Sequence, residues 1–248
     1  MNSVPVSIII PTLNEERYLP ILLESIFRCT SPRMEIVISN SPETKDKTLE
    51  VVEYYKERAP SHISLQSIAS SKPGVSNQRN SGAQHATNDV LIFLDADTCI
   101  PQPDRVQELV DLFLKENLAA ASCRFLPLDK DPRALLYYTT LYGFHKLVEK
   151  RDPYALGACI ITTKSVFEAC HGFDPSIKVN EDANFCLKAS NFGSFKVLPT
   201  VLQISTRRFR QYGYVRMGFL YIWMAISRTL FGERRDESIP YEWGKYES

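Results

Sequence analysis

The segment VSIIIPTLNEE, residues 6–16, joins an unbroken apolar run to a polar loop, and LIFLDADT, residues 91–98, repeats that form. Apolar runs of this length without alternation are typical of strands buried on both faces, as in the parallel sheets of α/β proteins. Ligands of such sheets bind beyond the carboxyl ends of the strands, where loops and helix N-termini converge. The two segments therefore predict a parallel sheet whose functional residues directly follow its strands.

The same pattern continues through the first half of the chain. Apolar runs of strand length occur at Val6–Ile10, Glu35–Ser39, Ile63–Ile68, Val90–Leu94 and Ala119–Phe125. Segments with helical periodicity lie between them, at Glu15–Cys29, Asp46–Arg58, Val75–Ala86 and Pro103–Glu116. This alternation predicts right-handed crossovers and an α/β fold with a mostly parallel central sheet and helices on both faces.

The second half is less regular. It predicts a helix near Arg133–Lys150, a strand at Ala158–Thr162, a short helix at Glu181–Ala189 and a last helix at Tyr212–Leu230. A charged tail, GERRDESIPYEWGKYES, follows at 232–248, and no repeat or Gly/Ser-rich linker divides the chain. We therefore expect one domain over residues 1–210 and a C-terminal amphipathic helix with a charged tail over 211–248.

Charge and cysteine content narrow the function classes. Lys plus Arg and Asp plus Glu each number 29, so no overall cationic field favours a nucleic-acid partner. The six cysteines form no CxxC pair and have no histidine at zinc-ligand spacing, which favours reduced, buried thiols. The first apolar run ends at Pro11, too short for a signal peptide or a membrane span, so we expect a cytoplasmic protein.

Two acidic pairs are candidates for chemistry. Asp95 and Asp97 end a strand two residues apart, so their carboxylates point to one side of the sheet. Like charges this close favour a divalent cation, Mg²⁺ or Mn²⁺, that bridges to phosphate oxygens. The alternative is that one Asp caps the next helix while the other is solvated.

The second pair, Glu181 and Asp182, opens a predicted helix, where negative charge is favourable at the N-terminus. Helix capping explains one acid more easily than two. A carboxylate here is suited to act as a general base that takes the proton of an acceptor hydroxyl.

The order of these motifs resembles the GT-A fold glycosyltransferases of family 2, over roughly residues 4–209. The opening strand and Pro-x-x-Asn-Glu loop imply that Pro11, Thr12, Asn14 and Glu15 line a nucleotide pocket. The family's acidic loop after the second strand reads Ile38-Ser39-Asn40-Ser41 here, so Asn40 is the nearest match to a residue that binds the base. An amide oxygen can accept that hydrogen bond, but the change leaves uridine and guanosine both open.

The resemblance also assigns roles further along the chain. GVSNQRNSGAQHA, residues 74–86, implies that Arg79 supplies a basic group to the nucleotide or diphosphate, with Asn80 as support. Asp97 is the implied metal ligand, and Asp95 binds ribose or the metal through water. Asp182, next to Glu181, is the implied catalytic base. The segment STRRFRQYG offers Arg207, Arg208 and Arg210 to the diphosphate, although these three side chains suit a solvent- or lipid-facing position equally well.

The implied activity is a metal-dependent, inverting transfer of a sugar from a UDP- or GDP-sugar to an acceptor hydroxyl or phosphate. LIFLDADT also fits the DxDxT pattern of haloacid-dehalogenase-like phosphatases, in which Asp95 would be the nucleophile. That nucleophile follows the first strand of its domain, whereas three strand–helix units precede Asp95 here. A non-catalytic nucleotide-sugar binding module is the other alternative.

The segment YGYVRMGFLYIWMAISRTLF, residues 212–231, combines aromatic and apolar residues with Arg216 and Arg228. Its unbroken apolar core, Phe219–Ile226, is far below the roughly 20 residues that span a bilayer. It suits an interfacial helix at the inner face of the membrane, which would favour a lipid-linked acceptor such as a polyprenyl phosphate or a glycolipid. The alternative is packing on the domain or on a second subunit, which would form a homodimer.

Overall fold

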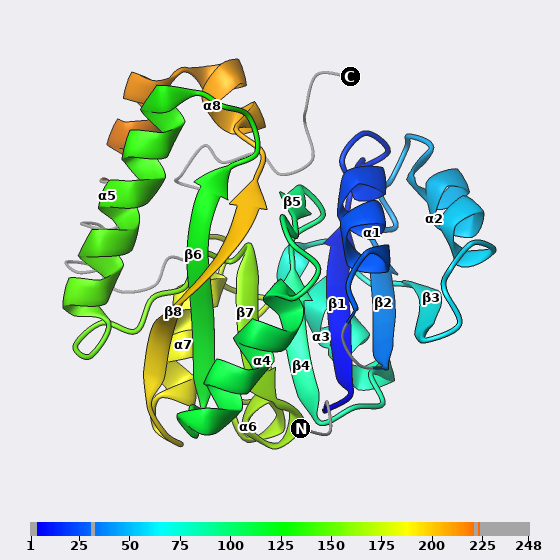
Figure 1. The fold of residues 1–248 in the computed structure, drawn as a ribbon, viewed down its shortest axis with the longest axis horizontal. Helices are drawn as coiled ribbons and strands as arrows, with labels where there is room; N and C mark the ends of the chain where they lie inside the picture. Colours follow the sequence, from blue (N-terminus) through cyan, green and yellow to red (C-terminus); the bar gives the residue numbers. More distant parts are fainter. Residues whose placement is uncertain (1–3, 31–32, 221–222, 224–248) are drawn as a thin grey trace.

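An eight-stranded sheet lies at the centre of the computed structural model, which describes residues 4–30, 33–220 and 223 (Figure 1). The strands are β1 (Val6–Thr12), β2 (Met34–Asn40), β3 (Ile63–Ala69), β4 (Val90–Leu94), β5 (Thr98–Cys99), β6 (Ala120–Pro127), β7 (Cys159–Thr163) and β8 (Phe195–Ile204). The helices of the described ranges include α1 (Leu19–Phe27), α2 (Thr48–Lys56), α3 (Val75–His85), α4 (Arg105–Lys115), α5 (Pro132–Val148), α6 (Lys164–Ala169), α7 (Glu181–Ala189) and α8 (Arg207–Tyr212).

The strand order is β3-β2-β1-β4-β7-β6-β8-β5. The first four strands pair in parallel, as predicted, and so do β6 and β8. β7 runs antiparallel to both β4 and β6, and β5 runs antiparallel to β8. The α/β class with helices on both faces is therefore confirmed, but the second half of the sheet is mixed, because β7 enters between β4 and β6 in the opposite direction.

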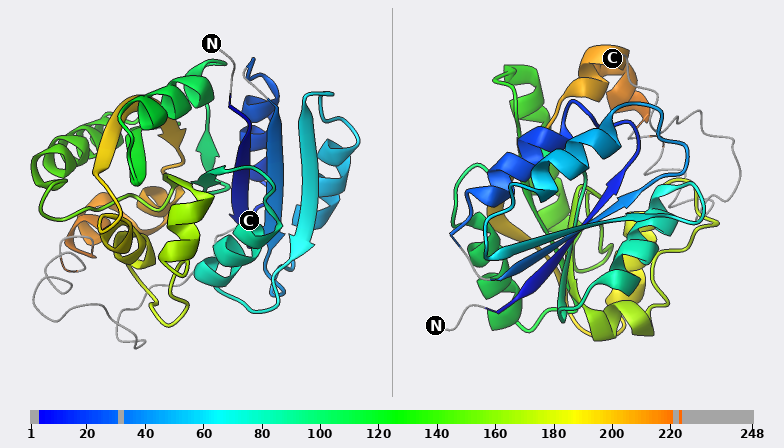
Figure 2. Two further views of the ribbon diagram at one scale, coloured as in Figure 1. Left: turned by 90° about the horizontal axis from the view of Figure 1, so that it is seen from below. Right: turned by 90° about the vertical axis from the view of Figure 1, so that its right-hand side faces the viewer.

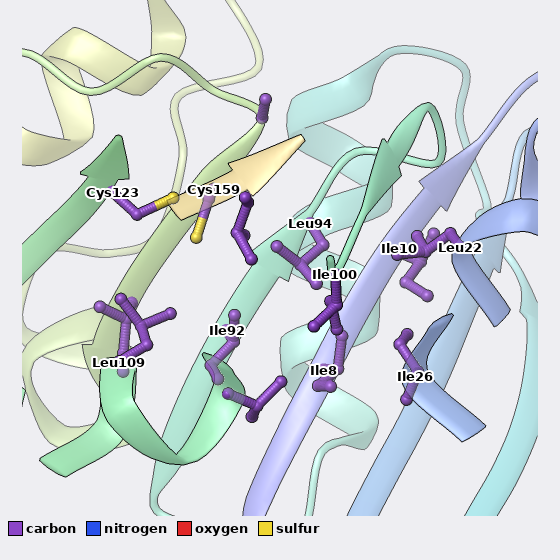
Figure 3. Packing of buried hydrophobic residues seen from close by; sticks show 14 of the residues in the cluster. Ile8, Ile10, Leu22, Ile26, Ile92, Leu94, Ile100, Leu109, Cys123 and Cys159 are labelled. Carbon is purple, nitrogen blue, oxygen red and sulfur yellow. The ribbon is translucent and has the colours of Figure 1, made fainter. Parts of the chain in front are cut away.

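Two hydrophobic cores cover the two faces of this sheet. Along β4, Ile92 and Leu94 face the core formed with α1, α2, α4 and α5, whereas Leu91 and Phe93 face the core formed with α6 and α7. Figure 2 shows helices on both sides of the sheet, and Figure 3 shows Ile8, Ile10 and Ile92 packed with side chains of α1 and α4. Burial on both faces explains why these strands read as continuous apolar runs.

Element boundaries differ from the prediction where local chemistry intervenes. β4 and α7 have the predicted bounds, whereas α1 begins at Leu19 instead of Glu15. Asn14 has a left-handed backbone (φ 56°), so the chain is not helical there and a loop separates it from α1. Pro20 occupies the first turn of α1. The sequence pattern predicted no element at the positions of β5, α6 and β8.

The C-terminal prediction is only partly covered by the described residues. Gly213, with φ of 80°, separates α8 from a further helical stretch over residues 214–220. The rest of the expected helix and the charged tail, apart from residue 223, lie outside the described residues. Within those residues no helix is long and apolar enough to cross a membrane. All six cysteines are free and buried.

Candidate active site

A cavity of about 390 Å³ lies beyond the carboxyl ends of β1 and β4. Its walls include the loop after β1, the loop after β4, the first turn of α3 and the start of α8. Predicted residues that line this cavity are Pro11, Thr12, Glu15, Asp95, Asp97, Arg207 and Arg208. The structure thus brings together residues almost 200 positions apart in sequence, at the edge of the sheet where the pattern predicted a site.

Arg207 bridges two carboxylates in this cavity. Its Nη1 and Nη2 each donate to the Glu15 carboxylate at 2.7 Å, and its Nε lies 3.0 Å from Asp97 Oδ2. Its guanidinium also lies 4.9 Å from the centroid of the Tyr18 ring. Burial raises the pKa of Glu15 to about 7, against the lowering effect of Arg207. α8 is therefore tied to the loop after β1 through a bidentate ion pair.

Arg79 occupies a different place from the one the motif implied. Its side chain is completely buried, and its Nη1 donates to Glu181 Oε1 at 2.8 Å. Its Nη2 donates to Asp95 Oδ1 at 2.9 Å and to the Gly157 carbonyl at 3.0 Å. The guanidinium thus joins the two acidic pairs and does not line the larger cavity.

Asn40 and Asn14 also have internal partners. The Asn40 amide oxygen accepts from the hydroxyls of Thr12 and Thr44, each at 2.9 Å. Asn14 Oδ1 accepts from the Lys45 backbone N–H at 2.8 Å. Neither residue is among the lining residues of this cavity, and both link the loop after β1 to the loop after β2. Their side chains therefore hold these two loops together next to the larger cavity.

A second, smaller cavity of about 90 Å³ adjoins the first and shares Asp95, Asp97 and Arg208 with it. Glu181 and Asp182 lie in its wall, as do aromatic residues from three parts of the chain: Tyr137, Tyr138, Tyr154 and Phe209. The two predicted acidic pairs therefore lie in one continuous site. Arg210 lines neither cavity, and its Nε lies 3.5 Å from Asp129.

Asp182 is held in the wall of the second cavity at the start of α7. Asn180, the residue before α7, has a left-handed backbone (φ 66°) and makes no side-chain cap, and Asp182 Oδ1 accepts from the Ala183 N–H at 2.7 Å. Burial, with a smaller contribution from Glu181, raises the pKa of Asp182 to about 7. Gly157 packs so closely that a Cβ there would lie 2.9 Å from Asp182 Oδ2. The carboxyl thus has the proton affinity of a base that works near neutral pH.

The donor atoms at Asp95 and Asp97 fit a divalent cation. Both carboxylates line both cavities, and hard cations such as Mg²⁺ and Mn²⁺ prefer oxygen ligands. Within the described ranges, no group of three or more His, Cys, Asp or Glu side chains is arranged to hold a metal. Mg²⁺ is usually bound through one or two carboxylates together with substrate phosphates, so this pair suits a cation whose coordination a diphosphate completes.

The sequence reasoning missed two groups of lining residues. The first turn of α3 contributes Gly74, Val75, Ser76 and Asn77 to the larger cavity. The first N–H groups of a helix have no acceptor within it and are suited to an anion, and the Pro73-Gly74 pair before the helical segment was the available signal. The aromatic side chains of α5 were missed because their helical periodicity could not show which of them reach the site.

Comparisons with known proteins agree with this geometry. Residues 7–170 match the family model described as Glycosyl transferase family 2. The chain is 34% identical over 124 residues to the glycosyltransferase YibD of Escherichia coli (strain K12), a match that covers 50% of this chain and 35% of that protein. It is 34% identical over 111 residues to the PGL/p-HBAD biosynthesis glycosyltransferase of Mycobacterium bovis, covering 45% of this chain and 42% of that protein. These matches span less than half of each relative.

Two solved structures share the fold. The mannosyltransferase PcManGT from Pyrobaculum calidifontis, in complex with GDP-Man and Mn²⁺, has a TM-score of 0.72 at 21% identity and covers 95% of this chain and 65% of that one. S. aureus TarS 1-349 in complex with UDP-GlcNAc has a TM-score of 0.64 at 17% identity, covering 95% and 69%. The fold is that of the GT-A transferases, as predicted.

Proposed function

The chain belongs to glycosyl transferase family 2, and on this premise we propose that it transfers a sugar from a UDP- or GDP-sugar to an acceptor hydroxyl, with inversion at the anomeric carbon. The observation that carries the proposal is the pair of adjoining cavities that share Asp95 and Asp97. One cavity is large enough for a nucleotide, and the other contains the candidate base. A sugar attached to the diphosphate would lie at their junction.

The larger cavity is the proposed donor site. Pro11, Thr12 and the first turn of α3 line it, so the nucleoside is proposed to lie against them. Arg207 and Arg208 are proposed to face the diphosphate, since a guanidinium pairs well with phosphate oxygens. GDP-Man in PcManGT and UDP-GlcNAc in TarS 1-349 support a nucleotide sugar as the donor class.

Asp95 and Asp97 would hold a Mg²⁺ or Mn²⁺ ion, which would supply positive charge against the diphosphate leaving group. Arg207 also neutralises part of the charge on Asp97. Glu15 anchors Arg207 from the opposite side, so this arginine is proposed to stay next to the phosphates during transfer. Arg79 is proposed to keep Asp95 and Glu181 at a fixed separation.

Asp182 is the proposed general base, with Glu181 as the neighbour that helps to keep its proton affinity high. It would remove the proton of the acceptor hydroxyl as the oxygen attacks the anomeric carbon. The C1–O bond to the diphosphate breaks on the opposite side, which is why the configuration inverts. A phosphate acceptor is the weaker alternative, because four carboxylates line the second cavity and would repel it.

The acceptor is proposed to be a sugar or polyol that stacks on the aromatic wall of the second cavity and offers one hydroxyl for the reaction. A glycolipid or other lipid-linked acceptor belongs to this class. Because all six cysteines are free, a reducing compartment suits the protein, and we place the reaction in the cytoplasm at the inner face of the membrane.

A screen of donors tests the proposal. We expect UDP- or GDP-sugars with Mn²⁺ to raise the melting temperature, because a ligand of the native state stabilises it. Labelled sugar should then move to an added hydroxyl acceptor or, more slowly, to water. The phosphatase alternative is tested with p-nitrophenyl phosphate. Its hydrolysis, together with indifference to every nucleotide sugar, would overturn the proposed function.

A further inference from the structure

α5 exposes apolar side chains on the face that points away from the domain. Ala134, Tyr138 and His145 are buried against the sheet. Leu136 and Leu147, which lie on the opposite side of the helix at i and i+11, are 67% and 83% exposed. A helix that is apolar on both faces is normally buried on both. The apolar side chains on the outer face of α5 therefore indicate that this face binds a partner.

A second group of exposed apolar residues lies next to it. Figure 1 shows α8 and the following helical stretch at the upper end of α5. In that stretch Val215 and Phe219 share one helical face, and with Trp223 they are between 51% and 74% exposed. The guanidinium of Arg133 on α5 lies 4.6 Å from the centroid of the Tyr214 ring, so the two segments are in contact.

An open groove runs between these two segments. It is lined by Arg133, Arg210 and Arg216 together with the aromatic and small residues Phe209, Tyr212, Gly213, Tyr214 and Val215. Arginines that border exposed apolar and aromatic side chains are the arrangement found where a protein lies in the headgroup region of a membrane.

The charge of this surface supports the same partner. The chain as a whole is neutral, yet neither α5 nor residues 207–223 contain a single Asp or Glu. Among the residues that the structure describes, the acidic partners of these segments lie at their edges: Asp131 pairs with Arg133, Asp129 with Arg210, and Glu149 with Lys146. The exposed part of both segments is therefore cationic and apolar, which complements an anionic lipid surface better than a neutral one.

We propose that the outer face of α5, with residues 214–220 and Trp223, is a docking surface for a membrane that contains anionic phospholipids. The apolar side chains enter the headgroup boundary, and Arg133 and Arg216 contact lipid phosphates. Tyr137 on α5 and Phe209 on α8 also line the second cavity, so docking presents that cavity to molecules held in the bilayer. The link to a lipid-borne acceptor rests on the proposed function, whereas the docking itself does not.

Co-sedimentation of the full chain with vesicles tests the proposal. The vesicles are made of phosphatidylcholine, either alone or mixed with phosphatidylglycerol. The protein should pellet with the mixed vesicles and lose this binding as salt is raised. The L136Q/L147Q variant should bind at least about tenfold more weakly, since two exposed leucines no longer enter the lipid. R133Q/R216Q should lose about tenfold or more, on anionic vesicles only.

Matched controls separate the surface from general effects. L49Q/L187Q removes two leucines, on α2 and α7, that are also exposed, at 51% and 46%, and it should bind like the parent. Glutamine has nearly the helix propensity of leucine, so all variants should melt like the parent. Parent protein that stays in the supernatant, or L136Q/L147Q that pellets like the parent, would overturn the proposal.

A second copy of the chain is the rival occupant. Sedimentation velocity without lipid would then show a dimer that L136Q/L147Q dissociates, with no binding to either vesicle, and this result also overturns membrane docking.

Donor hydrolysis measured without vesicles reports on the active site alone. A chain that binds vesicles but no nucleotide sugar would therefore refute the proposed function and leave the docking surface intact.

Discussion

At the scale of single residues, the site depends on how charges are paired. Arg79 is fully buried and pairs with Asp95 and Glu181. Arg207 pairs with Glu15 and Asp97. The Asp182 carboxylate instead accepts a hydrogen bond from the Ala183 N–H, and its pKa is raised by burial. The acids next to the donor cavity are thereby paired with arginines, and one acid in the second cavity has the proton affinity of a base that works near neutral pH.

The pKa of Asp182 predicts the pH dependence of transfer. Because this carboxyl must be ionised to act as a base and its pKa is about 7, kcat/KM should rise with pH and level off above about 7. Asp182→Asn should lower kcat by roughly 100-fold or more at every pH. Initial rates of sugar transfer across the pH range measure both.

Asp111→Asn, a change of the same kind on the outside of α4, is the control and should keep the parent's profile. A parent profile that is flat below neutrality, or an Asp182→Asn variant as fast as the parent, would show that another group takes the proton.

The sequence could predict the acids but not the arginines' partners. Asp95, Asp97, Glu181 and Asp182 stand directly after a buried strand or at a helix start, so local pattern was enough to single them out. The Arg79–Glu181 contact spans 102 positions and the Arg207–Glu15 contact spans 192. No local period encodes such pairs, since only the assembled sheet brings them within hydrogen-bond distance.

At the scale of secondary-structure elements, α3 determines the geometry of the site. Its first turn lines the donor cavity, and Arg79 follows one turn later. Gly82 lies against β1 so closely that a Cβ there would be 2.4 Å from Ile9 Cγ2. The glycine of the motif thus allows the close approach of helix and strand that puts Arg79 between the two acidic pairs.

Gly82→Ala should therefore destabilise the protein. Overpacking against Ile9 costs about 1–3 kcal/mol, which corresponds to a fall of several degrees in melting temperature for a chain of this size. Differential scanning calorimetry measures it. Gly143→Ala on α5 is the matched control, because nothing lies within 4 Å of the added Cβ, and it should be neutral or slightly stabilising. Equal melting temperatures for Gly82→Ala and the parent would contradict the close packing.

Strand β8 shows why some elements escape prediction. Its sequence, FKVLPTVLQI, contains Pro199, which argues against a central strand. The structure accommodates the proline at an irregularity, where the partners of β6 shift from Leu198 to Val201 and leave Pro199 and Thr200 outside the ladder. β5 has two residues, too few for any periodicity. By contrast, β4 is five buried apolar residues and was located correctly.

At the scale of the whole molecule, the loops after β1 and β4 and the starts of α3 and α8 meet at one edge of the sheet, and α7 closes the adjoining cavity. That convergence follows from parallel strands, and the sequence predicted it. The direction of β7 was not predictable, because an apolar run has the same pattern in either direction.

Asp95 and Asp97 are proposed to bind a nucleoside diphosphate through a divalent cation. Calorimetric titration of the protein with GDP and with UDP, in Mn²⁺ and then in EDTA, tests it most directly. We expect one nucleotide to bind in Mn²⁺ and to lose at least about tenfold in affinity in EDTA or in the Asp97→Asn variant. The same affinity with and without the metal, in parent and variant alike, would contradict it.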